Sequence, residues 1–571
     1  MSAPKNRMVN NNHGRDQFVG NSGPITVNNN APSESVLEKL VPRISTNALH
    51  NAKGRASRRA CLEGTRGGFI EKLGKWIEDP EGNGPVHWVR AGAGVGKTAI
   101  AQTLCEKYSL IENIEGQVLA AAFFFSRNDP SRNNMDQFVP TIAYQLARSP
   151  ALQPHLADAI DTAIRSDPGI MGADWENQFQ RLICEPCKRI SPELWKTLPR
   201  LVIIDGLDEC MDVHEPQTTD QRRNAWERDG QSRLLSMIQN SLTAPSSLPL
   251  RFLIFSRPEH TISNFFRNQS IPDLVQLDMR ELRSEADSDI FLYLTQEFAR
   301  LVKVRQDADL DPSWPGEEAI QALTIKSDGH FVYVVTVVKY LMDEDPSSTP
   351  QARLSIILLP RPSTHPDLSP LDELYLQILQ PFLNMRELLL PLLQLIMAPP
   401  QRSLSHAAIV IPDDSYRSRC FLAELLNQPD SRHIAIILSR LRSVLYVPDN
   451  EDEAVSVLHA SFSDFLSNQR RSNDFYVKSL DRPQYLDKLF PSSLRVLKRV
   501  MLRYKTDKGC AWPREPPVIE AWAFNTWFTL VERINIGFGA SSEGAPESLE
   551  EAVEDFDAYC YVNMLNDRYV F

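Results

Sequence analysis

A glycine-rich loop between an apolar run and a helix-forming stretch constrains this chain more than any other sequence feature. The run begins at Val86, and the loop behind it carries glycine at three alternate positions before a Lys-Thr pair. In such a loop the backbone N–H groups turn inward around a polyphosphate, and the N-terminus of the next helix adds partial positive charge. Lys97 would neutralise the β- and γ-phosphates, and the Thr98 hydroxyl would bind Mg²⁺. The residues predicted to hold the phosphates are Gly92, Ala93, Gly94, Val95, Gly96, Lys97, Thr98 and Ala99.

One position departs from the strict phosphate-loop motif, which has glycine where this chain has Ala91. Alanine is strained only where the backbone needs a positive φ. We therefore expect mild strain at Ala91, with nucleotide binding retained and the rate of hydrolysis left open.

An acidic motif follows a second apolar run, at residues 201–204. An apolar strand that ends in Asp205 places this carboxylate at the edge where open α/β sheets bind ligands. Asp205 would hold Mg²⁺ through water, and either Glu209 or Asp208 would orient or deprotonate an attacking water. The alternative is a buried strand followed by an acidic turn. The glycine-rich loop upstream favours the nucleotide site over that alternative.

A basic residue stands at the end of a further apolar run, where Arg257 follows residues 252–256. In P-loop ATPases a polar or basic residue at such a strand end senses the γ-phosphate, and Arg257 fits by position and charge. The alternative is a surface arginine in a turn. The chain has no Asn-Lys-x-Asp motif for reading guanine, so adenine is favoured.

Alternation of short apolar runs with helical patterns predicts an α/β fold with a five-stranded parallel sheet flanked by helices. The predicted strands are 86–89, 120–125, 201–205, 252–256 and 274–277, and residues 210–229 are expected to form a polar loop. Beyond residue 283 the pattern is helical, although residues 330–342 fit a helix or a strand. Residues 434–459 indicate helix, strand and strand, as in a winged helix.

Changes in pattern predict six segments. These are an Asn-rich tail (1–33), a helical segment (34–85), a P-loop NTPase core (86–282), a helical domain (283–365), a winged-helix-like domain (366–470) and a helical extension without detectable repeats (471–571). The tail is expected to be disordered. Its residues 15–30 are β-prone, and the alternative is that they assemble with a matching segment of a partner.

Composition narrows the choice of partners and compartment. The formal net charge of −12 and the absence of a dense basic run argue against nucleic acid as a partner. Eight scattered cysteines and no secretory apolar segment indicate reduced thiols in the cytoplasm. No apolar run is long enough to predict a membrane span.

Seven stretches in order along the chain resemble a fungal NACHT-domain NTPase. They lie within residues 61–66, 88–98, 123–127, 204–210, 256–259, 327–333 and 458–466. The resemblance implies a signalling NTPase related to NOD-like receptors, in which ADP locks a closed monomer and ATP exchange opens it for self-association. It also implies that Thr65 and Arg66 lie near the base, and that His459 is the winged-helix histidine that touches the β-phosphate.

The predicted function is therefore an ATP/ADP switch that depends on Mg²⁺ and hydrolyses nucleoside triphosphate slowly. Family members usually continue into sensor repeats, which are not detected here. Two alternatives stay open: a scaffold whose nucleotide site only supports the fold, and a different P-loop ATPase such as a kinase.

Overall fold

The computed structural model defines the arrangement of most of the chain. It describes residues 36–52, 60–79, 84–109, 117–127, 129, 131–211, 220–243, 247–268, 274–279, 283–305, 309–343, 348–359, 368–397, 417–426, 431–477, 495–499, 520 and 523. The Asn-rich tail, its residues 15–30 and most of the predicted C-terminal extension lie outside the described residues.

A five-stranded sheet in the order β2-β3-β4-β1-β5 forms the centre of the N-terminal half, and all its strand pairs are parallel. The strands are β1 (Val86–Arg90), β2 (Leu119–Phe124), β3 (Leu201–Asp205), β4 (Arg251–Ser256) and β5 (Val275–Asp278). The predicted α/β class and the five strands are confirmed, with ends within a residue of those expected. Because β4 lies between β1 and β3, their carboxyl ends meet at one edge of the sheet.

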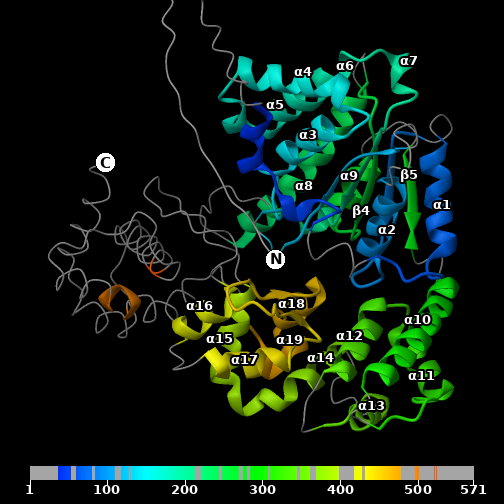
Figure 1. The fold of residues 1–571 in the computed structure, drawn as a ribbon, viewed down its shortest axis with the longest axis vertical. Coiled ribbons are helices and arrows are strands. Elements are labelled where there is room, and N and C mark those ends of the chain that lie inside the picture. Colours follow the sequence, from blue (N-terminus) through cyan, green and yellow to red (C-terminus); the bar gives the residue numbers. More distant parts are fainter. Residues whose placement is uncertain are drawn as a thin grey trace, which may run out of the picture.

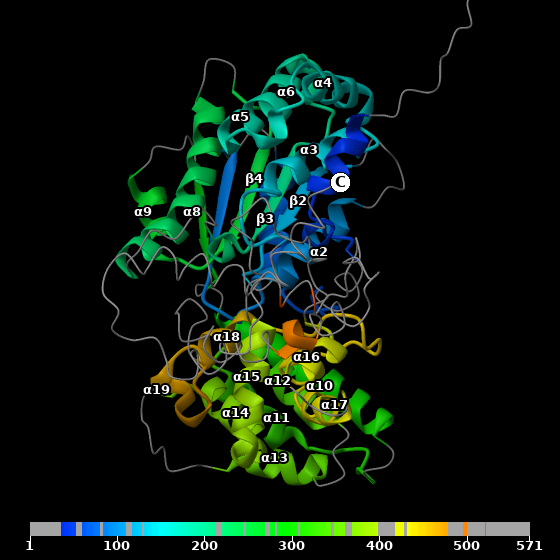
Figure 2. The same ribbon diagram turned by 90° about the vertical axis from the view of Figure 1, so that its left-hand side faces the viewer.

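Helices cover both faces of this sheet (Figures 1 and 2). Neighbouring strand residues alternate between two apolar clusters, since Phe123 packs into one and Phe124 into the other. One face is covered by α1 (Gly67–Glu78) and α2 (Lys97–Ser109). The other is covered by α3 (Phe138–Arg148), α4 (Gln153–Ser166), α5 (Trp175–Phe179), α6 (Glu185–Lys188), α8 (Asp220–Thr243) and α9 (His260–Asn268), while α7 (Pro192–Trp195) lies before β3.

The C-terminal half is helical and surrounds one apolar core. Its helices are α10 (Arg283–Val304), α11 (Glu317–Ser327), α12 (Phe331–Met342), α13 (Pro350–Leu358), α14 (Pro370–Leu379), α15 (Arg386–Met397), α16 (Arg419–Leu425), α17 (Ser431–Ser439), α18 (Ala460–Leu466) and α19 (Gln469–Ser472). Local sequence starts several of them: Thr349, Ser369 and Ser418 each accept a hydrogen bond from a first-turn amide as N-caps. The segment left open as helix or strand is helix α12.

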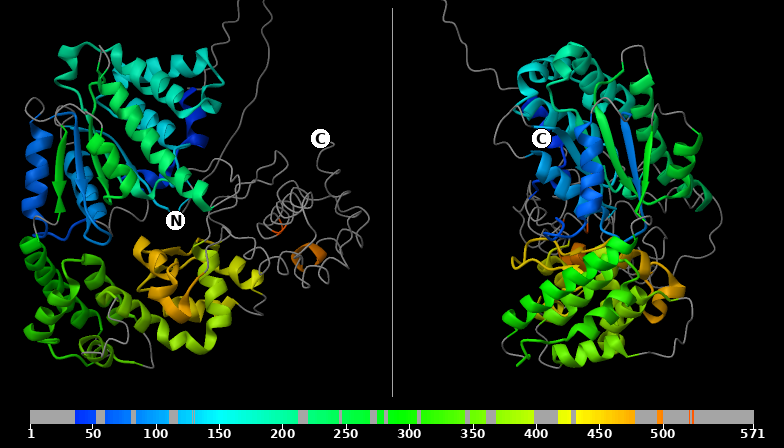
Figure 3. Two further views of the ribbon diagram at one scale, coloured as in Figure 1. Left: turned by 180° about the vertical axis from the view of Figure 1, so that it is seen from behind. Right: turned by 90° about the vertical axis from the view of Figure 1, so that its right-hand side faces the viewer.

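The predicted helix, strand and strand after residue 430 are present. Helix α17 is followed by β6 (Leu445–Tyr446) and β7 (Ser456–Val457), which pair antiparallel as a small wing. In Figure 3 the two halves are stacked, with the helical half below the sheet.

One expectation about secondary structure was wrong. The stretch predicted as a loop up to residue 229 is helical from Asp220, because α8 starts in a polar sequence that carries no apolar period. The start of the helical segment at 34–85 forms a 3₁₀ helix, Val36–Arg43. Among the described residues no helix is long and apolar enough to cross a membrane.

Candidate nucleotide-binding site

The glycine-rich loop connects the end of β1 to the start of α2 at Lys97. Two of its glycines need their lack of a side chain, since Gly94 has φ +75° and Gly96 has φ +101°. A Cβ placed on Gly94 would also lie 2.2 Å from Val332 Cγ1 of α12. At Gly92, by contrast, a Cβ would meet no atom within 4 Å.

The strain expected at Ala91 is absent. Its φ is not among the positive values in the chain, and its backbone N–H donates to Ser256 O at 3.1 Å. This bond extends the pairing of β1 with β4 by one residue, and alanine adopts a φ outside the positive range freely. The prediction of mild strain was therefore wrong.

The Lys97 side chain is held over the glycine-rich loop by backbone carbonyl groups at the start of that loop. Its Nζ donates to Ala91 O at 3.0 Å and to Gly92 O at 2.7 Å. Burial lowers the pKa of Lys97, against the opposing effect of Asp208 and Asp205. Thr98 and Ala99 follow in the first turn of α2 and are half-buried. The lysine, the first-turn N–H groups and the Thr98 hydroxyl thus lie together.

The acidic motif lies where the sequence predicts, at the carboxyl end of β3. Asp205 is the last residue of this strand, and its side chain is buried. Gly206 then takes φ +71°, and a Cβ there would lie 3.2 Å from Phe125 O, so this turn favours glycine. Asp208 and Glu209 follow in a short 3₁₀ turn.

The two candidate acids have different partners. Asp208 Oδ1 accepts the backbone N–H of Arg257 at 2.9 Å, and Oδ2 lies 3.1 Å from Arg257 Nε. Glu209 Oε2 accepts the backbone N–H of Arg127 at 3.1 Å. Burial, followed by repulsion from Asp208, raises the pKa of Glu209. Because Asp208 is committed to an arginine, Glu209 is the better candidate for a base.

Arg257 stands at the carboxyl end of β4, between the glycine-rich loop and the acidic turn. Its Nη1 also donates to Asp464 Oδ2 at 2.7 Å, from α18 of the winged region. Burial acts to lower the pKa of Arg257, but Asp464 and Asp208 outweigh it and the pKa is raised.

Arg127 is a site residue that the sequence analysis missed. It follows β2 and donates from Nη1 to Asp464 Oδ1 at 3.4 Å and from Nη2 to Asp208 O at 3.4 Å. The one available signal was its place directly after a predicted strand, within a stretch that carried the family resemblance.

The segment before α1 contributes Arg66 to the loop. Arg66 has φ +59° and donates from Nη2 to Val95 O at 2.6 Å. Its backbone N–H donates to Asp289 Oδ2 of α10 at 2.9 Å, and its guanidinium lies 4.6 Å from the centroid of the Phe331 ring. Thr65 is buried but bonds to Leu62 O at 2.7 Å, so its hydroxyl stabilises its own turn.

His459 also lies at the loop, although it comes from the other end of the chain. It is the N-cap of α18, and its Cε1 would lie 3.8 Å from a Cβ on Gly94. Its Nδ1 accepts the N–H of Ser461 at 3.1 Å, which assigns the proton of the neutral ring to Nε2. Ser461 Oγ lies 2.6 Å from that Nδ1 and 2.8 Å from Tyr375 Oη. These bonds fix the orientation of the ring.

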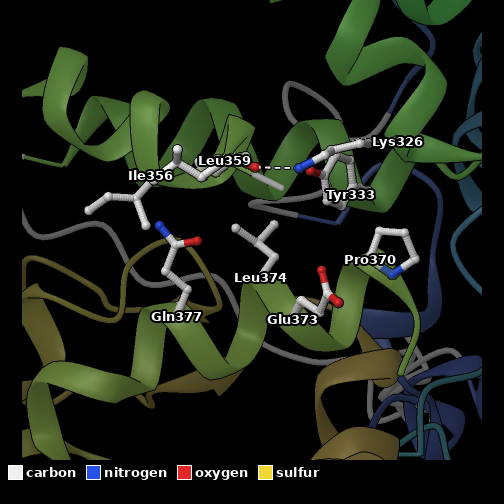
Figure 4. Close-up of a pocket in the computed structure, with 9 residues that line it drawn as sticks. Lys326, Tyr333, Ile356, Leu359, Pro370, Glu373, Leu374 and Gln377 are labelled. Atoms are coloured by element: carbon white, nitrogen blue, oxygen red, sulfur yellow. Dashed lines mark hydrogen bonds between the residues drawn. The ribbon is translucent and has the colours of Figure 1, made fainter. Parts of the chain in front are cut away.

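A separate small pocket of about 60 Å³ lies in the helical half, between α11, α12, α13 and α14 (Figure 4). The Lys326 ammonium at its edge donates to Ile357 O at 2.6 Å. None of the predicted phosphate-binding residues lines this pocket. Its chemistry is therefore unrelated to the loop at the sheet edge.

The donor set at the sheet edge fits a nucleotide with Mg²⁺. Lysine and helix N-terminal amides suit phosphate oxygens, and a hydroxyl with a buried carboxylate, here Thr98 and Asp205, suits Mg²⁺. When bound, Mg²⁺ would offset the negative charge of the β- and γ-phosphates.

A family model matches part of the chain that carries this geometry. The family model "Nephrocystin 3, N-terminal" matches residues 69–257, about a third of the chain. None of the curated proteins matches. Among solved structures, the chain is similar to the Aeropyrum pernix ORC2 protein in its ADPNP–ADP complexes, at 13% identity over 78% of this chain and 97% of that one, with a TM-score of 0.31. The sheet order, the loop and the family match together show a P-loop NTPase-like fold.

Proposed function

We propose that the protein is a NACHT-type signalling NTPase that binds ATP or ADP with Mg²⁺ and changes conformation with the bound nucleotide. It hydrolyses ATP slowly in the cytoplasm and self-associates in its ATP form, in signalling of the kind that fungal incompatibility proteins carry out. This proposal extends the nucleotide-dependent function that a P-loop NTPase-like fold supports.

One observation carries the proposal: residues from the C-terminal half reach the candidate phosphate site. Val332 N–H donates to Gly94 O at 3.0 Å, His459 lies beside the same glycine, and Asp464 pairs with Arg257. A switch needs such contacts, because the state of the nucleotide must be transmitted to the part of the chain that moves.

The proposal assigns a role to each residue of the site. Lys97 and the first-turn N–H groups of α2 bind the phosphates, while Thr98 and Asp205 hold Mg²⁺. Glu209 orients a water and accepts its proton, and Arg257 binds the γ-phosphate. Arg66 supports the loop through Val95 O, and His459 would donate from Nε2 to the β-phosphate.

The energetic requirement of such a switch is differential binding. ADP and ATP shift the balance between two conformations only by the difference in their affinities for the two states. A tenfold difference corresponds to about 1.4 kcal/mol, and a nearly complete switch needs about 5.5 kcal/mol. Contacts that depend on the γ-phosphate must supply this difference.

Native mass spectrometry of the purified full-length protein tests the proposal, because it reports the bound nucleotide and the assembly state together. We expect ADP-bound monomers, and larger assemblies after exchange into an ATP analogue. Lys97→Ala should lose the nucleotide, since it removes the ammonium group that neutralises the β- and γ-phosphates. A Lys97→Ala variant that retains nucleotide would refute the proposed site.

The alternatives predict different chemistry. A scaffold with a structural nucleotide retains ADP but does not hydrolyse ATP, whereas a switch hydrolyses it and loses this activity in Glu209→Gln with binding intact. Glu209 Oε2 accepts the backbone N–H of Arg127. The side-chain oxygen of glutamine can accept the same hydrogen bond, so the variant keeps this contact. Phosphate transfer to any acceptor other than water would identify a kinase.

A further inference from the structure

Two arginines from different strand ends converge on one carboxylate. Asp464 of α18 accepts from Arg257 Nη1 at one oxygen, at 2.7 Å, and from Arg127 Nη1 at the other, at 3.4 Å. Arg257 follows β4 and Arg127 follows β2, so they flank the acidic turn that follows β3. We call Arg127 and Arg257 the arginine pair.

The arginine pair is fixed in place by the NTPase core. Arg257 is held by Asp208 through both its backbone N–H and its Nε. Arg127 donates its backbone N–H to Glu209 Oε2, and Asn133 Nδ2 donates to Arg127 O at 3.4 Å. Arg127 Nη2 also donates to Asp208 O at 3.4 Å, so the core itself positions both guanidinium groups.

The arginine pair also lies where a triphosphate would end. Glu209, the candidate base, is bonded to the backbone of Arg127, and an attacking water lies between the base and the γ-phosphate. Guanidinium groups bind phosphate oxygens in the same way as carboxylate oxygens, and a dianionic phosphate attracts them more strongly. Asp464 thus occupies a site with the chemistry of a γ-phosphate site.

From this geometry we propose that Arg127 is a second γ-phosphate-binding residue, and that Asp464 occupies the arginine pair when no γ-phosphate is there. The inference rests on the proposed function. When ADP is bound, the arginine pair stays bonded to Asp464, and α18 stays on the core. ATP competes with Asp464 for the arginine pair, so its binding releases α18.

A merely structural salt bridge would behave differently. Breaking it would weaken the contact between the halves and change the affinities for ADP and for ATP alike. Competition instead changes the ratio of the two affinities, because only ATP carries the group that displaces Asp464. The ratio of ATPγS affinity to ADP affinity is therefore the decisive quantity.

Titration calorimetry with nucleotide-stripped full-length protein, Mg²⁺ and either ADP or ATPγS measures this ratio. We expect Asp464→Asn, which keeps the shape and removes the charge, to raise the ratio about tenfold. We expect Arg127→Gln to lower it about tenfold. The matched control is Asp474→Asn, which breaks an exposed ion pair with Arg386 in the same half and should leave the ratio unchanged.

Each outcome decides the question. If both variants bind ADP and their ratios equal that of the wild type, the competition model is wrong and the switch stands without it. If the wild type binds neither nucleotide, the proposed function and this inference both fail. Should Asp464→Asn not fold by circular dichroism, Arg127→Gln tests the same site from the core side.

Discussion

At the scale of single residues, Gly94 joins the phosphate loop to the helical half. Its φ of +75° disfavours any side chain, and a Cβ there would overlap Val332 Cγ1 at 2.2 Å. We predict that Gly94→Ala destabilises the nucleotide-free protein by about 1–3 kcal/mol in denaturant unfolding. Part of that loss is steric, so Gly94→Ala should cost less in a Val332→Ala background than in the wild type, where the overlap adds to the backbone strain.

Gly92→Ala is the matched control for this prediction. A Cβ at Gly92 meets nothing within 4 Å, and its φ is not positive. The variant should unfold like the wild type when nucleotide is absent. Equal destabilisation by both alanines would contradict the account of Gly94, because only one of the two sites is crowded.

At the scale of elements, β1 carries a buried histidine beneath α1. His87 lies edge-on to Trp76 at 5.1 Å between ring centroids. Burial, with the nearby charges of Arg251 and Lys72, lowers the pKa of His87 from 6.5 to about 4. The unfolded chain therefore binds more protons than the folded one between these values, and stability is lost as the pH falls through that window.

The expected size of the His87 effect follows from the two pKa values. At pH 5 the protonated unfolded state gains about 2 kcal/mol relative to neutral pH. His87→Leu removes this titration, so the difference in unfolding free energy between pH 7.5 and pH 5 should shrink by that amount, whatever the stability of the variant at pH 7.5. An unchanged difference would show that His87 is not neutral in the folded sheet.

Sequence patterns predicted the elements better than the contacts between them. The strand ends at Asp205 and Ser256 followed from apolar runs, because a strand buried on both faces has a continuous apolar sequence. The pairing of Arg127 with Asp464 joins residues 337 positions apart, and neither side chain stands in a pattern that names its partner. The prediction of strain at Ala91 was wrong because its backbone N–H bonds to Ser256 O of β4, and no local sequence pattern shows this pairing.

At the scale of the whole molecule, the two parts of the helical half are attached to the NTPase core in different ways. Helix α10 follows the sheet directly in the chain and is bonded through Asp289 to the backbone N–H of Arg66. Helix α18 is held by Asp464 and by the position of His459 at the loop. The first attachment reaches the glycine-rich loop only through Arg66, whose side chain donates to Val95 O, whereas the second bonds Arg257 and places His459 at Gly94.

Exchange of ADP for ATPγS should therefore separate the two parts. Hydrogen exchange measured by mass spectrometry should show faster exchange in peptides that cover α18, where the N–H of Ser461 is held by His459 Nδ1. Peptides that cover α10 should keep their protection, because the bond between Arg66 and Asp289 does not depend on the nucleotide. Lys97→Ala should show neither change. Equal deprotection of α10 and α18 would mean that the C-terminal half moves as one body, and that the contacts of Asp464 are not the part of the interface that responds to nucleotide.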